Sequence, residues 1–358
     1  MVGKTKARRE SGVTSTKSSS CRSDSFRPEQ MKARTGSPRE PSEAVHVGEK
    51  SSVSTKNMSR EEWLERRRLS IGGSDAAAII GLNPYASAYT VWADKTGRLP
   101  DKPDNEAMRQ GRDFEDYVAA RWCEETGKRV RRVNAMRYHA AYPFAHADVD
   151  RWVVGEPAGL ECKTTSVMNL KQFKDGAYPE QYYVQCVHYM AVTGAERWYL
   201  GVLVLGQGFY TFVIERDEEE IRALMETEAA FWEHVETDVP PVADGSSATT
   251  DALSVIYADS DDEGSIELFG RERIIREYME LKDTSKALER RMEEIKQNIM
   301  QDLGEHERGS CGGYVATWKQ QSRRSFDVKR FCEDYPGEHT ENYWKTTKVR
   351  SFHIKELK

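Results

Sequence analysis

Two carboxylates and a lysine in the middle of the chain have residue types and a spacing that suit phosphodiester hydrolysis. Asp150 precedes a turn at Gly155-Glu156-Pro157, and Glu161-Cys162-Lys163 follows it. In a hairpin around this turn, Asp150 and Glu161 would oppose each other and hold one hard cation, while residue alternation puts Lys163 on the strand face of Glu161. The metal would lower the pKa of a bound water, and the lysine would orient the nucleophile or stabilise the charge of the transition state. Charged triplets on strands are also common as solvated faces, so the motif alone leaves both interpretations open.

The elements that must position these residues follow from the periodicity of the apolar side chains. Helical spacing and a glycine stop predict a helix over 106–126, and similar signals predict helices over 180–193 and 218–236. Short runs typical of strands lie between and after them, over 129–133, 145–154, 159–164, 198–204 and 209–215. This order of elements predicts an α/β fold with a central mixed sheet flanked by helices.

An anion site is predicted ahead of these elements. Ser59-Arg60-Glu61-Glu62 is a capping box that begins one helix, and Ile71-Gly72-Gly73-Ser74 is a glycine turn before a second helix capped by Ser74. The free N–H groups at such a helix start favour an anion, which Arg67 can clamp. The alternative is that Ser74 only caps the helix and that Arg67 is solvated.

Five motifs, taken in order along the chain, resemble the YqaJ-like viral recombinase family, relatives of the phage lambda exonuclease within the PD-(D/E)xK nuclease superfamily. They are Arg67 with Ile71-Gly72-Gly73-Ser74-Asp75, Gly111-Arg112-Asp113-Phe114-Glu115, Ala147-Asp148-Val149-Asp150-Arg151, Gly159-Leu160-Glu161-Cys162-Lys163-Thr164, and Tyr182-Tyr183-Val184-Gln185-Cys186-Val187-His188-Tyr189-Met190. The resemblance covers about residues 63–235. It implies a restriction-endonuclease-like core, and the small C-terminal helical/α+β appendage also resembles one often fused to this family.

The resemblance further implies a metal centre. Asp150 and Glu161 resemble the shared ligands of a metal pair, Glu115 resembles the helix carboxylate that helps to bind the second ion, and Cys162 falls within the metal-binding set. The expected cofactor is Mg²⁺ or Mn²⁺, as two ions. The oxygen-rich ligand set agrees with this, and no His/Cys set suggests zinc.

Further roles are implied for residues around the metals. Lys163 resembles the catalytic lysine, and Gln185 resembles the glutamine that contacts the attacking water or the scissile phosphate. Arg67 and Ser74 resemble the pocket that captures a 5′-phosphate at a duplex end. Asp148 departs from the lambda-type pattern, which has a small hydroxyl residue near that pocket; it is either an extra metal ligand or a residue that weakens phosphate capture.

The function implied is that of a metal-dependent exonuclease that digests linear double-stranded DNA, 5′ to 3′, and leaves single strands for phage-type homologous recombination. Duplex ends, a single-strand annealing protein and further copies of the chain are the implied partners. Two alternatives stay open. One is a restriction-like or structure-specific endonuclease, and the other is a catalytically inactive DNA-binding module of the same fold.

Composition permits these functions and excludes others. A net charge of −6 and a pI of about 5.9 argue against a protein that simply coats nucleic acid. The six cysteines form no CxxC pair, which argues against a zinc ribbon or an iron–sulfur cluster. There is neither a long apolar run nor a secretory signal, so we expect no membrane contact and a cytoplasmic location in a bacterial host, with the gene carried by a phage, prophage or mobile element.

The chain divides into four predicted parts. Residues 1–58 are rich in Ser, Thr, Lys and Arg and should be a disordered basic extension, either an arm that gathers DNA or the product of a mis-assigned start before Met58. Residues 59–237 form the nuclease domain, and 238–264 an acidic flexible linker. Residues 265–358 should contain an amphipathic helix over 266–303 and strands over 314–319 and 348–354, in a small α+β domain.

Overall fold

The computed structural model describes residues 52–101, 103–259, 264–322, 325 and 327–335, and the elements named below lie in these ranges. The helices are α1 (Arg60–Arg68), α2 (Gly73–Ile79), α3 (Ala88–Lys95), α4 (Glu106–Thr126), the 3-10 helix η2 (Val167–Phe173), α5 (Glu180–Thr193), α6 (Glu218–Glu236), α7 (Ser247–Ile256), α8 (Glu272–Leu303) and α9 (Val328–Asp334). The strands are β1 (Ser52–Ser54), β2 (Val130–Arg132), β3 (Ala135–Tyr138), β4 (His146–Asp148), β5 (Arg151–Val153), β6 (Ala158–Thr165), β7 (Arg197–Val204), β8 (Gly208–Glu215), β9 (Arg308–Cys311) and β10 (Tyr314–Thr317).

The central sheet has five strands in the order β2-β5-β6-β7-β8. Strands β6 and β7 pair in parallel, and every other neighbouring pair is antiparallel, so the sheet is mixed. The parallel pair requires a crossover connection, which η2 and α5 supply. The predicted α/β fold with a central mixed sheet flanked by helices is therefore confirmed.

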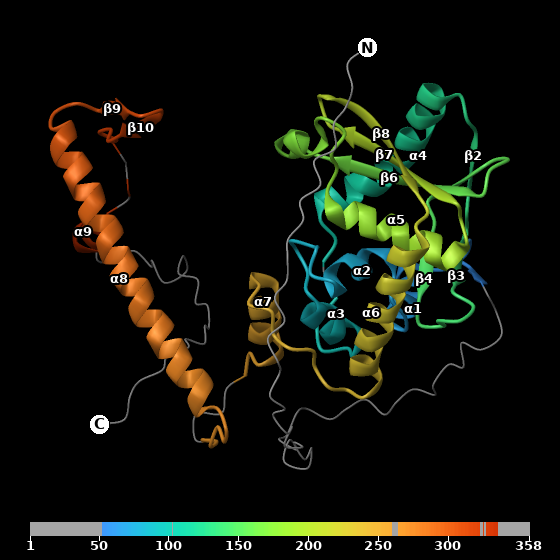
Figure 1. Cartoon of the computed structure of the whole chain (residues 1–358), viewed down its shortest axis with the longest axis horizontal. Helices are drawn as coiled ribbons and strands as arrows, with labels where there is room; N and C mark the ends of the chain where they lie inside the picture. Colours follow the sequence, from blue (N-terminus) through green and yellow to red (C-terminus); the bar gives the residue numbers. More distant parts are fainter. Residues whose placement is uncertain (1–51, 102, 260–263, 323–324, 326, 336–358) are drawn as a thin grey trace, which may run out of the picture. The chain divides into compact units, whose positions relative to one another are not determined.

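Helices cover both faces of this sheet, with α4 and α5 on opposite sides of β6, β7 and β8 (Figure 1). On the α4 face, Leu160 and Tyr199 pack around the fully buried Trp122. On the α5 face, Trp198 and Leu200 belong to the largest apolar cluster. Because side chains alternate along a strand, Glu161 and Lys163 point to the α5 face.

The predicted strand over 145–154 is in fact two strands in two different sheets. Strand β4 pairs with β3 in the small sheet β1-β3-β4, whereas β5 pairs with β2 and β6 in the central sheet. The chain changes sheets at 149–150, so Asp150 stands at the joint between them. Buried and half-buried side chains alternate from Ala147 to Val153 without a break, so the periodicity of a single strand does not reveal the joint.

The predicted extension over 1–58 is wrong for its last residues. Ser52–Ser54 forms β1, which pairs with Ala135–Arg137 of β3, and Thr55 continues with a backbone hydrogen bond to Asn134. Pairing with a distant strand satisfies the backbone groups of this polar segment, which its composition cannot reveal. The rest of the predicted extension lies outside the described residues.

The predicted linker over 238–264 contains a packed helix. Ser246 caps α7, and Ala252 of α7 is buried in the apolar cluster that holds Trp92 of α3. A hydrogen bond of 2.8 Å joins the buried hydroxyls of Ser87 and Thr249. Small residues make α7 look solvated in the sequence, but their size is what allows it to lie close to α3.

The C-terminal elements agree in part with their prediction. Helix α8 covers Glu272–Leu303 of the expected 266–303, and β9 and β10 form an antiparallel pair that includes part of the expected strand over 314–319. The expected strand over 348–354 lies outside the described residues. Among the described helices, none combines the length and the apolar character needed to cross a membrane.

The close approach of β6 and β7 generates a first prediction. A Cβ atom at Gly159 would lie 2.2 Å from the Trp198 indole ring, which packs directly against the glycine. We expect Gly159→Ala to lower the free energy of unfolding by about 1–3 kcal/mol, as overpacking of a core does. Urea unfolding measures this.

Gly111→Ala is the matched control, because Gly111 lies inside α4 with open space at its Cβ position. That substitution should stabilise the protein by up to about 1 kcal/mol, the difference in helix propensity. Equal effects of the two substitutions would contradict the packing argument.

Candidate active site

A three-residue cluster forms where β6 meets α5. The Nζ atom of Lys163 lies 2.6 Å from Oε1 of Glu161 and donates to Oε1 of Gln185 at 2.9 Å. Gln185 donates in turn from Nε2 to Glu161 Oε1 at 2.7 Å and to the Tyr189 hydroxyl at 2.9 Å. The glutamine of the crossover helix therefore fixes the positions of the carboxylate and the ammonium group of the strand.

Asp150 joins this cluster through the backbone of β6. The β5–β6 ladder pairs Arg151 with Leu160, and the same register continued by one residue puts Asp150 opposite Glu161. Asp150 Oδ2 accepts a hydrogen bond of 2.8 Å from the Cys162 backbone N–H. The sequence-predicted opposition of the two carboxylates across the hairpin holds in the structure, although Asp150 itself lies just outside the strand.

The cluster holds more acidic groups than basic ones, since Asp150, Glu161 and Glu115 lie near a single lysine, Lys163. Burial, followed by the charges of Glu161 and Glu115, raises the pKa of the Asp150 carboxyl well above its ordinary value. Burial also raises the pKa of Glu161, although the neighbouring Lys163 opposes the shift. For Lys163, burial alone would lower the pKa, but Glu161 and Asp150 outweigh it and raise the pKa, so the amine stays protonated.

The donor chemistry of Asp150 and Glu161 fits a hard divalent cation. Glu161 Oε2 is buried and has no hydrogen-bond partner among the described residues, and carboxylate oxygens are the ligands that Mg²⁺ and Mn²⁺ prefer. In the same part of the chain, no three His, Cys, Asp or Glu side chains stand close enough together to form a ligand set by themselves. Asp150 and Glu161 are thus chemically suitable ligands, but with their neighbours they do not form a set of three ligands in the described part of the chain.

Two members of the predicted metal set are engaged elsewhere. Glu115 projects from α4 and forms an ion pair with Arg151, a nearly buried residue that also contacts Asp116 at 2.5 Å. The Cys162 thiol packs against the apolar cluster around Trp122, on the sheet face opposite to Glu161, and burial raises its pKa well above the ordinary value. Cys162 therefore contributes its backbone N–H to the site, and its thiol does not face the carboxylates.

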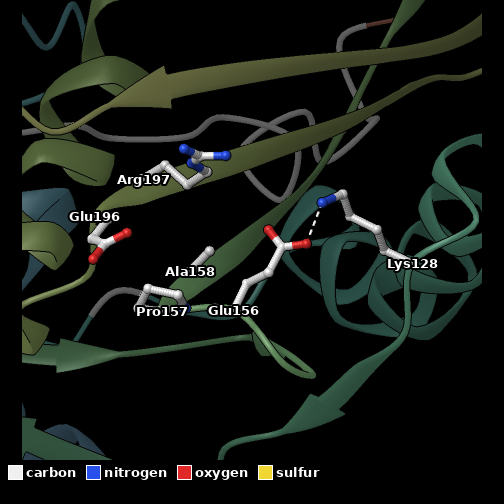
Figure 2. A pocket seen from close by; sticks show the side chains of 6 residues that line it. All are labelled: Lys128, Glu156, Pro157, Ala158, Glu196 and Arg197. Carbon is white, nitrogen blue, oxygen red and sulfur yellow. Dashed lines mark hydrogen bonds and ion pairs between the residues drawn. The ribbon is translucent and has the colours of Figure 1, made fainter.

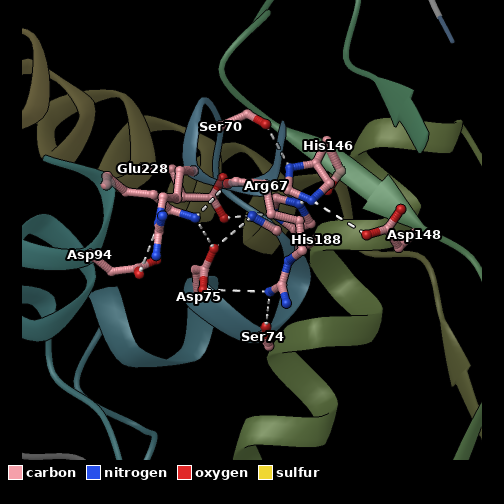
Figure 3. Close-up of polar contacts among 12 residues, drawn as sticks. Arg67, Ser70, Ser74, Asp75, Asp94, His146, Asp148, His188 and Glu228 are labelled. Carbon is pink, nitrogen blue, oxygen red and sulfur yellow. Dashed lines mark hydrogen bonds and ion pairs between the residues drawn. The ribbon is translucent and has the colours of Figure 1, made fainter. Parts of the chain in front are cut away.

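The predicted anion pocket lies at the start of α2 (Figure 3). Arg67 donates from Nη2 to the Ser74 hydroxyl at 2.9 Å, and its guanidinium group stacks on the Trp63 ring at 4.8 Å. Ser74 is not the helix cap, because Gly72 holds the cap position and Asp75 accepts from the Gly72 N–H at 3.0 Å. The simple capping role for Ser74 is thus wrong, and its hydroxyl is free to serve Arg67.

Sequence reasoning missed the residues that support this pocket. Lys95 of α3 is almost fully buried and donates from Nζ to Asp75 Oδ2 at 2.7 Å and to the Arg67 carbonyl at 2.8 Å. Although burial opposes it, the positive charges of Lys95 and Arg67 hold the pKa of Asp75 well below its ordinary value. The charge pair fixes the α1–α2 loop, and no spacing in the sequence links Lys95 to it.

Asp148 and His146 of β4 lie beside the anion pocket. Burial raises the pKa of Asp148 to about 6, against the opposing effects of Arg67 and a hydrogen bond from Trp63. His146 Nε2 lies 3.7 Å from Asp148 Oδ2, and Nδ1 lies 2.8 Å from the Ser70 hydroxyl. Burial, Arg67 and Lys95 lower the pKa of His146 well below its usual range, so this ring is neutral.

The His146 backbone contacts a buried pair that the sequence did not reveal, His188 of α5 and Glu228 of α6. His188 Nδ1 is 2.8 Å from Glu228 Oε1, and both side chains are fully buried. His188 Nε2 donates to the His146 carbonyl oxygen at 2.8 Å, because a carbonyl only accepts. His188 thus ties β4 to α5 and α6, a role that the sequence analysis did not predict.

A separate shallow pocket lies at the opposite end of β6 from Lys163. Lys128 and Glu156 form an ion pair on its wall, beside Ala158 and Arg197 (Figure 2). The Tyr199 hydroxyl also donates to Glu156, at 2.9 Å. None of the sequence-predicted site residues lines this pocket, so it is distinct from the candidate active site.

A mixed sheet that presents Asp150 and Glu161-x-Lys163 across a hairpin, with a glutamine from the crossover helix, has the arrangement of the PD-(D/E)xK class of proteins. The chain belongs to the YqaJ-like viral recombinase family. The model of the YqaJ-like viral recombinase domain matches residues 62–196. The YqaJ protein of Bacillus subtilis (strain 168), itself uncharacterised, is 40% identical over 306 residues, which cover 84% of this chain and 95% of that protein.

Two solved structures are similar to part of this chain. An alkaline exonuclease from Laribacter hongkongensis has a TM-score of 0.43 and 22% identity, and the match covers 50% of this chain and 93% of that one. A phage-related exonuclease from Haemophilus somnus 129PT has a TM-score of 0.39 and 14% identity, covering 49% of this chain and 99% of that one.

The buried histidine–glutamate pair generates a pH prediction. Burial by itself would lower the pKa of His188, but Glu228 outweighs it and raises the pKa above the ordinary value. The pair therefore stabilises the fold fully below the unfolded-state pKa of about 6.5, and this contribution is lost as the pH rises through the raised pKa of the folded state. We expect Glu228→Gln to lower the free energy of unfolding by about 3 kcal/mol at pH 6, and by clearly less at pH 9.

Thermal unfolding at the two pH values measures the difference. Glu226→Gln is the control, since Glu226 lies on the exposed face of the same helix. A loss for Glu228→Gln that is the same at both pH values would mean that the pair is neutral in the folded protein.

Proposed function

We propose that this chain is a metal-dependent exonuclease that hydrolyses phosphodiester bonds of linear double-stranded DNA and leaves single strands for phage-type recombination. The observation that carries the proposal is the cluster of Glu161, Lys163 and Gln185. In this cluster Glu161 Oε2 is buried and lacks a hydrogen-bond partner among the described residues. The family supports the recombination role, since the matched domain is named for viral recombinases and spans every residue of the predicted site.

In the proposed mechanism, Asp150 and Glu161 would hold the divalent ion, with Glu115 as a further carboxylate nearby. When bound, the ion lowers the pKa of water and neutralises charge on the phosphate. Lys163 remains protonated beside the carboxylates and stabilises the additional negative charge that develops on the phosphate oxygens. Gln185 holds Lys163 and Glu161 at a fixed separation. We expect the cofactor to be two Mg²⁺ or two Mn²⁺ ions.

The pocket of Arg67 and Ser74 favours an exonuclease over an endonuclease. Arginine and a hydroxyl are suitable donors for a terminal 5′-phosphate, which a closed circle lacks. Binding of that phosphate would set the 5′-to-3′ direction of digestion. Asp148 beside Arg67 reduces the positive charge of the pocket, and we assign it to this pocket rather than to the metals. A single-strand annealing protein is the partner that the proposed product requires.

The first test of this function uses the catalytic lysine. With Mg²⁺ present, we expect the wild type to release nucleotides from linear duplexes and to leave closed circles intact, and we expect EDTA to stop the reaction. Lys163→Ala should lower the rate by on the order of 10²–10³-fold, the usual effect of removing one charge-stabilising donor.

Lys171→Ala is the matched control, because Lys171 is exposed on η2, outside the cluster. Cleavage of circles by the wild type would identify an endonuclease instead. Failure to cleave any DNA with any divalent metal would identify a binding module.

A second test addresses the pocket. Arg67→Lys keeps the charge but loses the planar fork, and Ser74→Ala removes the hydroxyl that Arg67 contacts. Each should reduce the ratio of rates on 5′-phosphorylated and 5′-hydroxyl ends by on the order of tenfold, about 1.4 kcal/mol of phosphate binding. The rate on 5′-hydroxyl ends serves as the internal control, and an unchanged ratio would remove this pocket from phosphate recognition.

A further inference from the structure

Lys95 of α3 is a buried charged residue beside the anion pocket of Arg67 and Ser74. Its side chain is only 2% exposed, and Nζ donates to Asp75 Oδ2 at 2.7 Å and to the Arg67 carbonyl oxygen at 2.8 Å. Removing an ammonium group from water is unfavourable, and a neutral donor could also hold the α1–α2 loop by hydrogen bonds. Fixing the loop therefore does not by itself account for a positive charge at this position.

The group that this charge acts on is the Asp75 carboxylate. Its Oδ2 atom accepts from the Gly72 N–H at 3.0 Å and from Lys95 Nζ at 2.7 Å. Its Oδ1 atom lies 3.9 Å from Nη2 of Arg67, which donates instead to the Ser74 hydroxyl at 2.9 Å (Figure 3). Burial opposes ionisation, but the charges of Lys95 and Arg67 hold the pKa of Asp75 well below its ordinary value. Asp75 is thus an anion whose closer cationic partner is Lys95.

We propose that Lys95 is a positioning residue for recognition of a terminal phosphate, because it binds the Asp75 carboxylate and so leaves the Arg67 guanidinium group available to the ligand. This inference rests on the proposed capture of a 5′-phosphate by Arg67 and Ser74. Among the described residues, the cations that contact Asp75 are Lys95 and Arg67. Without Lys95, Arg67 would close on the carboxylate and would keep fewer N–H donors for a phosphate.

The charge balance of the pocket supports the same role. Arg67 and Lys95 are positive and Asp75 is negative, so the three side chains together are cationic, whereas without Lys95 they would be neutral. A terminal phosphate carries about −1.5 to −2 charges at pH 7, and a hydroxyl end carries none. We therefore expect Lys95 to set the preference for phosphorylated over unphosphorylated ends.

Binding of short duplexes in EDTA tests this role without any cleavage. Fluorescence anisotropy compares a duplex with 5′-phosphate ends and the same duplex with 5′-hydroxyl ends, and we expect the wild type to prefer the first. Lys95→Met keeps the length of the side chain but removes its charge, and it should lower this preference by on the order of tenfold. Lys128→Met is the matched control, because Lys128 pairs with Glu156 in the separate shallow pocket, and it should leave the preference unchanged.

A second substitution separates this role from a purely structural one. In Lys95→Met/Asp75→Asn, the amide oxygen at position 75 can still accept from the Gly72 N–H, and no carboxylate competes for Arg67. The double variant should therefore recover the preference for the phosphorylated duplex, although both hydrogen bonds of Lys95 stay lost. If Lys95 only fixed the loop, the double variant would bind the two duplexes as Lys95→Met does.

Asp75→Asn alone gives an independent measurement if Lys95→Met does not fold, which circular dichroism reveals. It removes the competing carboxylate while Lys95 remains, so the preference should equal or exceed that of the wild type. An unchanged preference in Lys95→Met, a double variant that does not recover it, or a reduced preference in Asp75→Asn would overturn the proposal. A wild type without any preference would overturn both the phosphate pocket and this role, whereas Lys163→Ala tests hydrolysis separately.

Discussion

The parallel pairing of β6 with β7 is the constraint on which the candidate active site depends. Two parallel strands that are neighbours in a sheet need a crossover, and the helix of that crossover must cover one face of the sheet. Helix α5 covers the face to which Glu161 and Lys163 point, so Gln185 reaches both of them. Gly159 permits the approach, because any side chain there would overlap the Trp198 ring beside α5.

Two neighbouring sites in this core have different charge balances. Around Asp150 and Glu161 the acids outnumber the bases, and both acids bind protons more tightly than usual, which is the condition that a divalent cation relieves. In the anion pocket, Arg67 and Lys95 share Asp75 and are held in place before any ligand arrives. The neutral His146 lies beside the anion pocket, and a buried chain of contacts through His188 connects its backbone to α6.

The sequence by itself determined the type of each main element and the identity of the central carboxylate–lysine motif. Helical periodicity placed α4, α5 and α6 at their observed bounds, with a glycine stop after each of the first two, and alternation put Glu161 and Lys163 on one face. These features are local, because they depend on residues within one or two turns of each other. Only the tertiary structure decided the contacts made at long range. Those contacts are the pairing of β1 with β3, the division of β4 from β5, the packing of α7 on α3, and the partners of Lys95 and Glu228. Each joins residues far apart in the chain, and no single-chain spacing records which of them will meet.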